Sequence, residues 1–282
     1  MNKKVSAPPP KRTSFLACAA AAPHMVWMVL FIVAPLLFVV YYAFTDANGA
    51  FTVDNILALQ DHMDTFLLSV AMSVIATFLC LLIGYPLAYC ISKTGKRMQK
   101  VLILLLMLPM WMNLLIRTYS TMAILDDGGF LNSFLTSIGL RELHIVGTAP
   151  AVIFGMVYNF LPYMVLPLHS VISKLDIRYI EAAGDLGCNS FRTLTRVVIP
   201  LSTSGIVSGI TMVFVPSIST FYISQKLGGG TFDLIGDTIE RQFQNPSTYN
   251  VGAAISLVMM ILILLSMAVM NHFSEDEGTV IV

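Results

Sequence analysis

The sequence predicts an all-α polytopic membrane protein with six transmembrane helices. Only 11% of its 282 residues are charged and 56% are hydrophobic, whereas about a quarter of an ordinary soluble domain is charged. Long stretches without a charged residue recur along the chain, and about 20 apolar residues are enough for a helix to cross a bilayer core. Lys and Arg balance Asp and Glu at 16 each, so no nucleic-acid partner is expected.

Each apolar stretch predicts one membrane-spanning helix. Strands of a membrane barrel would instead alternate polar and apolar residues over about 10 positions, a pattern that these stretches lack. The first stretch is longer than the apolar region of a signal peptide, which has about 7–15 residues, and it has no clear small-residue cleavage site. We therefore expect an uncleaved first span. The six predicted helices are 20–44, 66–91, 101–124, 150–171, 204–224 and 251–271.

The distribution of Lys and Arg predicts that both termini are cytoplasmic. Basic residues collect in the cytoplasmic loops of membrane proteins, and 12 of the 16 lie before the first span, after the second or after the fourth. The opposite loops hold ten acidic residues and three basic ones. This acidic excess has two interpretations. Either it follows from the bias in the basic residues, or it forms a mouth that attracts a cationic solute or a basic partner.

No motif for metal binding, nucleotide binding or catalysis stands out. The four cysteines lie far apart without a paired spacing, so they predict packing rather than a metal site. The tripeptide Thr94-Gly95-Lys96 lacks the first glycine and the final Ser or Thr of a phosphate-binding loop. If the protein uses the energy of ATP, another chain must bind the nucleotide.

The segment 174–200 has a pattern that spanning a membrane does not explain. Apolar and small residues recur at helical spacing over 175–186, with Asp176 placed to cap the helix and Gly187 placed to end it. Asn189 can then cap a second short helix. An amphipathic helix with a face of small residues suits either a partner surface or the membrane interface, and the spacing alone leaves both open.

The same segment resembles the EAA loop of permease subunits in ABC importers. Glu181-Ala182-Ala183, Gly187 and the ending Val197-x-Ile199-Pro200 reproduce its spacing, although Ile and Leu are usual where Val197 and Ile199 stand. Further stretches resemble the PotB-type permeases of spermidine/putrescine importers, from about residue 65 to residue 270. These stretches are GYPLAY (84–89), LPMWMNLLIRTY (108–119), LPYMVLPLHS (161–170) and EAAGDLG (181–187).

The resemblance implies a permease of the type I ABC importer, or MetI-like, architecture in the bacterial cytoplasmic (inner) membrane. Such a permease would pair with a second, homologous permease and two cytoplasmic ATPase subunits, and an extracytoplasmic polyamine-binding protein would deliver the solute. The chain itself would hold no metal or cofactor and would not be an enzyme, because the partner ATPase would bind ATP and Mg. The coupling residues implied by the resemblance are Glu181, Ala182, Ala183, Asp185, Leu186 and Gly187.

The spans and loops predict four parts of the chain. Residues 1–19 would form a cytoplasmic N-terminal arm, and 20–64 the first transmembrane helix with its outer loop. Residues 65–271 would form the five-helix permease core that includes the coupling loop, and 272–282 a cytoplasmic tail.

Polar and aromatic residues within or beside the spans are candidates for a solute pathway. A polyamine carries ammonium groups joined by methylenes, so its path should alternate hydrogen-bond acceptors with aromatic faces. The alternative is that these side chains pack helices together, as the Gly205-xxx-Gly209 spacing suggests nearby, or form an interfacial belt. The candidates are Trp111, Asn113, Tyr158, Asn159, Tyr163, Ser217, Tyr222 and Gln225.

One cation lies inside an expected span. Arg117 would repel a polyamine, so we expect it to lie near the outer surface and to pair with Asp126 or Asp127. Two alternatives to a polyamine permease stay open: an ABC permease for another cationic or small organic solute, and a secondary transporter. A secondary transporter would be expected to show inverted repeats and buried acids, and no Asp or Glu lies in an expected span.

Overall fold

The computed structural model describes residues 15–46, 48–230 and 233–278. It describes side chains for residues 22–270, with the same two gaps, and for His272. Over these residues the chain is helical and contains no strand. Its segments, with π-helices η1 and η3 and the 3-10 helix η2, are α1 Phe15–Met28, η1 Val29–Val33, α2 Ala34–Ala43, α3 Asp54–Leu57, η2 Ala58–His62, α4 Met63–Lys93, α5 Lys96–Trp111, α6 Leu114–Leu125, α7 Phe130–Ser137, α8 Ala149–Ile172, α9 Ile177–Asp185, α10 Ser190–Thr193, η3 Leu194–Val198, α11 Ile199–Leu201, α12 Thr203–Ile218, α13 Tyr222–Leu227, α14 Ile235–Gln244 and α15 Tyr249–Gly278.

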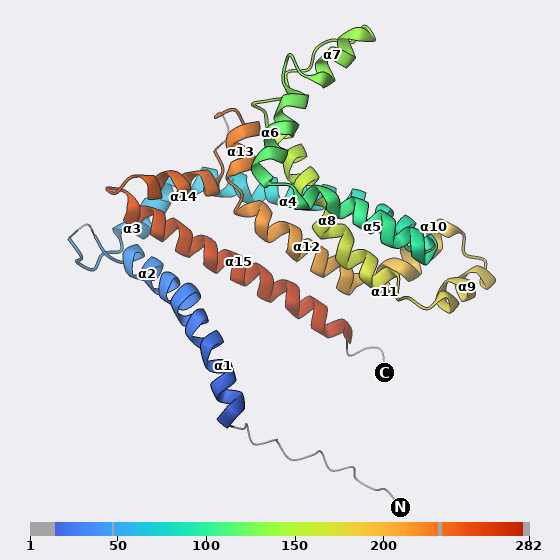
Figure 1. Ribbon diagram of the computed structural model, residues 1–282, viewed down its shortest axis with the longest axis horizontal. Coiled ribbons are helices and arrows are strands. Elements are labelled where there is room, and N and C mark those ends of the chain that lie inside the picture. Colours follow the sequence, from blue (N-terminus) through green and yellow to red (C-terminus); the bar gives the residue numbers. More distant parts are fainter. Residues whose placement is uncertain (1–14, 47, 231–232, 279–282) are drawn as a thin grey trace, which may run out of the picture.

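Helices α4, α8 and α12 pack against one another and form the core of the bundle (Figure 1). Small residues allow this close approach. A Cβ placed on Gly209 of α12 would lie 2.6 Å from the Sδ of Met164, and one on Gly205 would lie 3.1 Å from the Cβ of Val171. Met164 is fully buried between these helices. The Gly205-xxx-Gly209 spacing therefore marks a true helix–helix contact, in which small residues bring two backbones together.

The structure contains between four and six helices that could cross a membrane. Four described helices are long and apolar enough by themselves: Ala22–Ala43, Asp54–Lys93, Ala149–Ile172 and Tyr249–Met270. Two further spans are broken helix pairs, and counting each pair once gives the six predicted from the sequence. The all-helical architecture is thus confirmed, whereas the cytoplasmic placement of the termini and the four-part division of the chain stay predictions.

The prediction of one continuous helix over 101–124 is wrong. The chain turns by 94° between α5 and the segment that begins at Leu114. Pro109 lies in the last turn of α5, where its ring removes a backbone donor and crowds the preceding turn. Met112 is extended, and Asn113 starts α6 by accepting the backbone N–H of Leu115 at 2.8 Å. A proline followed by a strong N-cap residue therefore splits this span.

The expected helix over 204–224 is also interrupted. A bend of 72° lies just before the expected helix, between Leu201 and Thr203. Separately, helix α12 ends at Ile218, two residues after Pro216. The chain resumes as the short helix α13, which lies beside α6 and the start of α8 in the upper part of Figure 1. The two breaks together set α6, α7 and α13 at a steep angle to the core helices.

The first span stands away from the core. Helices α1 and α2 point away from the bundle in Figure 1, and most of their described side chains are exposed in the isolated chain. The span is attached near its C-terminal end, where Ala43 packs on Ala253, Ala254 and Leu257 of α15. Because its surface is apolar on all sides, this helix requires lipid or another membrane protein around it.

We expect Gly209→Ile to destabilise the folded chain by about 1–3 kcal/mol, since the added side chain would overlap Met164 in a packed contact. The matched control is Ser208→Ile, the same substitution at the exposed neighbouring position on α12. Thermal unfolding of both variants in detergent measures the difference. Equal midpoints for the two would contradict the assigned α8–α12 contact.

Candidate functional site

The segment 174–200 folds into the two short helices that the sequence predicts. Asp176 accepts the backbone N–H of Arg178 at 3.0 Å and caps α9. Gly187 ends this helix with a φ of +78°, a left-handed conformation that favours glycine. Backbone N–H groups of Gly187 and Cys188 close the end on carbonyls of α9, as in a Schellman cap. Asn189 then caps α10 by accepting the N–H of Arg192 at 2.8 Å.

This double cap holds α9 beyond the end of the core, at the right of Figure 1. Ile180 packs against the main core and Ala183 is buried, so they attach the helix to the protein. Glu181, Ala182, Asp185, Leu186 and Gly187 are exposed. Leu186 has 85% of its surface exposed, and Ile177, Tyr179 and Phe191 are exposed nearby in sequence. An exposed apolar group of this kind, with the acidic residues Glu181 and Asp185 beside it, is typical of a docking surface.

The eight pathway candidates do not converge on one cavity. Trp111 is 70% exposed at the end of α5, beside Asn113, which caps α6. Asn159 and Ser217 are buried, and each donates a hydrogen bond to a carbonyl of its own helix. Tyr163 packs by its ring against Phe160. The roles of these residues in a pathway stay predictions.

Tyr158 lies with Arg117 in a cavity of about 570 Å³ between α6, α7 and α8. The expected ion pair of Arg117 with Asp126 or Asp127 is absent among the described residues. Arg117 is only 8% exposed, and its Nη1 donates to the carbonyl of Pro109 at 3.1 Å. Asp127 instead lies 2.8 Å from the Nδ1 of His144. The guanidinium is held by the carbonyl at the helix break, because the 94° turn directs it there and not toward the outer loop.

The two candidates on α13 have partners that the sequence analysis did not identify. Gln225 donates to a carboxylate oxygen of Glu240 on α14. The ring of Tyr222 lies edge-on to that of Tyr119, with centroids 6.1 Å apart. The ammonium of Lys226 lies over both rings, 5.2 Å from the Tyr119 centroid and 5.8 Å from the Tyr222 centroid. A Lys four residues after a Tyr on a short helix was the one sequence signal for this cluster.

An acidic residue of the expected outer mouth is buried. Asp237 on α14 is 3% exposed, so it does not contribute to an acidic surface. One of its oxygens, Oδ2, lies 2.6 Å from the hydroxyl of Ser224 and accepts the N–H of Leu234 at 2.8 Å. The N–H of Ile235 donates to Ser69 of α4. These bonds attach the start of α14 to α13 and α4. Burial raises the pKa of Asp237 from 3.8 to about 6.

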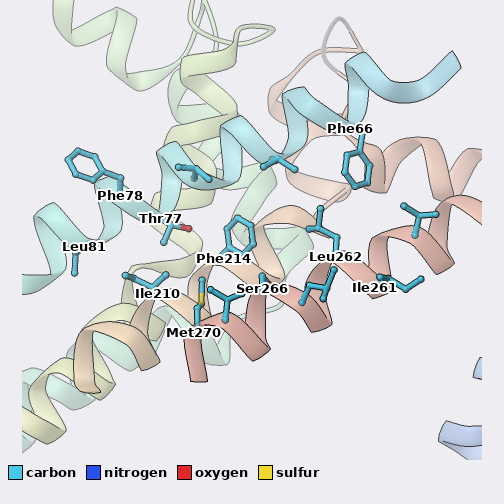
Figure 2. A pocket seen from close by; sticks show the side chains of 15 residues that line it. Phe66, Thr77, Phe78, Leu81, Ile210, Phe214, Ile261, Leu262, Ser266 and Met270 are labelled. Atoms are coloured by element: carbon cyan, nitrogen blue, oxygen red, sulfur yellow. The ribbon is translucent and has the colours of Figure 1, made fainter. Parts of the chain in front are cut away.

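An apolar groove on the core is unsuited to a cation. It measures about 790 Å³ and lies between α4, α12 and α15, where Figure 2 shows Phe66, Phe78, Phe214 and Leu262 along its walls. No charged residue lines it. Its two hydroxyls, Thr77 and Ser266, donate to carbonyls of their own helices. Such a surface suits lipid chains or an apolar helix.

Comparisons with known proteins agree with this geometry. Residues 81–276 match the family described as the binding-protein-dependent transport system inner membrane component. The spermidine/putrescine transport system permease protein PotB of Salmonella typhimurium is 40% identical over 245 residues, 83% of this chain and 85% of that protein. PotB of Haemophilus influenzae is 37% identical over 249 residues, 85% of this chain and 87% of that protein.

A solved structure has the same fold at low sequence identity. It is that of a bacterial ABC transporter involved in the import of the acidic polysaccharide alginate, with a TM-score of 0.73 and 19% identity over 93% of this chain and 95% of the other. The helical bundle is thus that of an importer permease, a transport component of the inner membrane. This chain belongs to the family of binding-protein-dependent transport system inner membrane components.

The raised pKa of Asp237 predicts a pH-dependent stability. Between about pH 4 and pH 6 the folded state keeps a proton on Asp237 that the unfolded state has lost, so stability falls as the pH rises through this window and changes no further above it. Asp237→Asn should reduce the fall in the unfolding midpoint between pH 4.5 and 6.5, measured in detergent. Asp64→Asn, at an exposed position, is the control and should keep the wild-type profile. Identical pH profiles for wild type and Asp237→Asn would refute the assignment.

Proposed function

We propose that this chain is a permease subunit that moves a polyamine, of the spermidine and putrescine class, across the inner membrane, and that a separate ATPase supplies the energy. The observation that carries the proposal is the exposed, double-capped loop at the end of the core. It presents Glu181 and Leu186 outward while Ala183 fixes the helix. The identity of about 40% with PotB proteins over most of the chain supports the solute class.

The proposed assembly has two related permeases and two ATPase subunits, with an extracytoplasmic binding protein on the opposite face. The ATPases would bind ATP and Mg, and their closure would move α9 and, through Ile180 and Ala183, the core helices. Rigid-body motion of packed helices is a common route for such coupling. A polyamine would be guided by aromatic faces and acceptors beside the two helix breaks, because its ammonium groups favour both.

Coupling can be tested by Glu181→Lys and Gly187→Val. Glu181→Lys reverses the charge that the exposed face offers a partner, and Gly187→Val forces a β-branched residue into a left-handed conformation. Both should abolish most of the stimulation of ATP hydrolysis by loaded binding protein, or prevent assembly with the ATPase, in purified complexes.

The matched controls lie outside the coupling loop. Gly139 has a φ of +80° and open space around it, so Gly139→Val imposes the same backbone strain elsewhere. Glu142→Lys makes the same charge reversal at an exposed site. Both controls should retain assembly with the ATPase subunits and basal ATP hydrolysis. Wild-type assembly and wild-type stimulation of ATP hydrolysis in both Glu181→Lys and Gly187→Val would contradict a coupling role for this loop.

The aromatic pathway can be tested by Trp111→Leu and Tyr158→Leu. Loss of one cation–π contact of about 0.5–2 kcal/mol corresponds to about a 2- to 30-fold loss in the rate of polyamine uptake at low solute. Uptake into proteoliposomes containing the whole importer measures this, with assembly and basal ATP hydrolysis expected near wild type. The control is Trp27→Leu, the other tryptophan, which is exposed on the first span. Unchanged uptake in both test variants would show that these rings have only a packing role.

The same assay compares solutes. Uptake of spermidine or putrescine, and its absence for a neutral amino acid, is the expected result. Uptake of another cation only would identify an ABC permease of different specificity. Uptake without the ATPase subunits would identify a secondary transporter.

A further inference from the structure

The cluster of Tyr119, Tyr222 and Lys226 is an aromatic site that already holds an ammonium group. The Lys226 Nζ lies 5.2 Å and 5.8 Å from the two ring centroids, within the range of about 6 Å for an attractive contact. The rings meet edge to face at 78°, so they present two differently oriented surfaces to one cation. Both distances describe a primary ammonium, the same group that ends a polyamine chain.

Lys226 is held there without an acidic partner. Among the described residues no carboxylate forms an ion pair with it, although acidic residues are common in the surrounding loops. Its partners are the two ring faces and the hydroxyl of Tyr119, to which it is hydrogen-bonded. Another ammonium can make the same contacts, and no ion pair has to be broken first.

The site is also open. Tyr119 is 46% exposed, and Tyr222 and Lys226 are half-buried. The two rings come from different elements, α6 and α13, each of which follows a break in a span. The residue next to Lys226, Gln225, is bonded to Glu240, so a carboxylate of α14 is attached to the same short helix. Such an arrangement suits a chain with two ammonium groups, because the aromatic site can bind one end and the acidic oxygen can bind the other.

We propose that Tyr119 and Tyr222 form an ammonium-binding subsite for the transported polyamine, and that the chain's own Lys226 occupies it until a substrate ammonium displaces it. This inference rests on the proposed function, because it assigns a site to the proposed solute. Lys226 acts as a tethered competitor: it fills the subsite in the absence of solute and lowers the apparent affinity for polyamine.

The test uses the complete importer in proteoliposomes, with radiolabelled spermidine as the probe and the apparent KM of uptake as the readout. Lys226→Met removes the competitor and should lower the KM by about threefold or more. Tyr222→Leu and Tyr119→Leu should raise the KM, whereas the Phe substitutions keep the ring and should stay much closer to wild type. Lys226→Gln gives a second, polar replacement if the Met variant does not assemble.

A combined variant separates competition from a structural role. In a background that carries both Tyr119→Leu and Tyr222→Leu, Lys226→Met should no longer lower the KM, because Lys226 can compete only where a ring is present. The matched control is Lys93→Met. It removes an ammonium that lies 5.3 Å from the ring of Tyr89 at the C-terminal end of α4, and it should leave the KM unchanged.

The outcomes distinguish this subsite from the proposed function. If the wild-type importer takes up spermidine but Lys226→Met has an unchanged or raised KM, or lowers it equally when both rings are absent, the subsite is wrong and the permease function stands. If the wild-type importer takes up no polyamine, the proposed function fails and the subsite fails with it.

Discussion

Backbone N–H and C=O groups inside a bilayer must be hydrogen-bonded within the protein, because no water is there to receive them. This requirement determines where the helices can be interrupted. At the first break Asn113 accepts a backbone N–H and Arg117 donates to the carbonyl of Pro109. At the 72° break before α12, Ser202 donates to the carbonyl of Ile199 and is hydrogen-bonded to Tyr85 of α4. Polar side chains at both breaks therefore satisfy backbone that helix geometry leaves free.

The breaks in turn create the chemically distinctive part of the molecule. The core of α4, α8 and α12 is apolar and closely packed, and no charged residue lines its groove beside α15. Exposed rings, a buried guanidinium and a lysine with no ion-pair partner among the described residues occur where α6 and α13 leave the core direction. A buried carboxylate, Asp237, fixes the following helix in place. Interrupted helices commonly provide polar binding positions at membrane depth.

The fold and the solute are separate matters in this family. The alginate importer has the same fold at 19% identity and is involved in the import of an acidic polysaccharide, whereas PotB proteins are named for cationic polyamines. The same fold therefore serves solutes of opposite charge, and the fold alone does not define the solute.

The sequence by itself determined the membrane class, the apolar stretches that can form spans and the two capped helices of 174–200, because these depend on local properties. Apolar length predicts a span, and Asp176, Gly187 and Asn189 each act on the nearest turn of their own helix. Only the tertiary structure decided where the spans break, that Arg117 contacts Pro109 and not an outer acid, that Asp237 is buried, and that Tyr119 meets Tyr222 and Lys226. Each of these depends on the direction of a helix after a bend and on residues up to about a hundred positions apart, which no local pattern encodes.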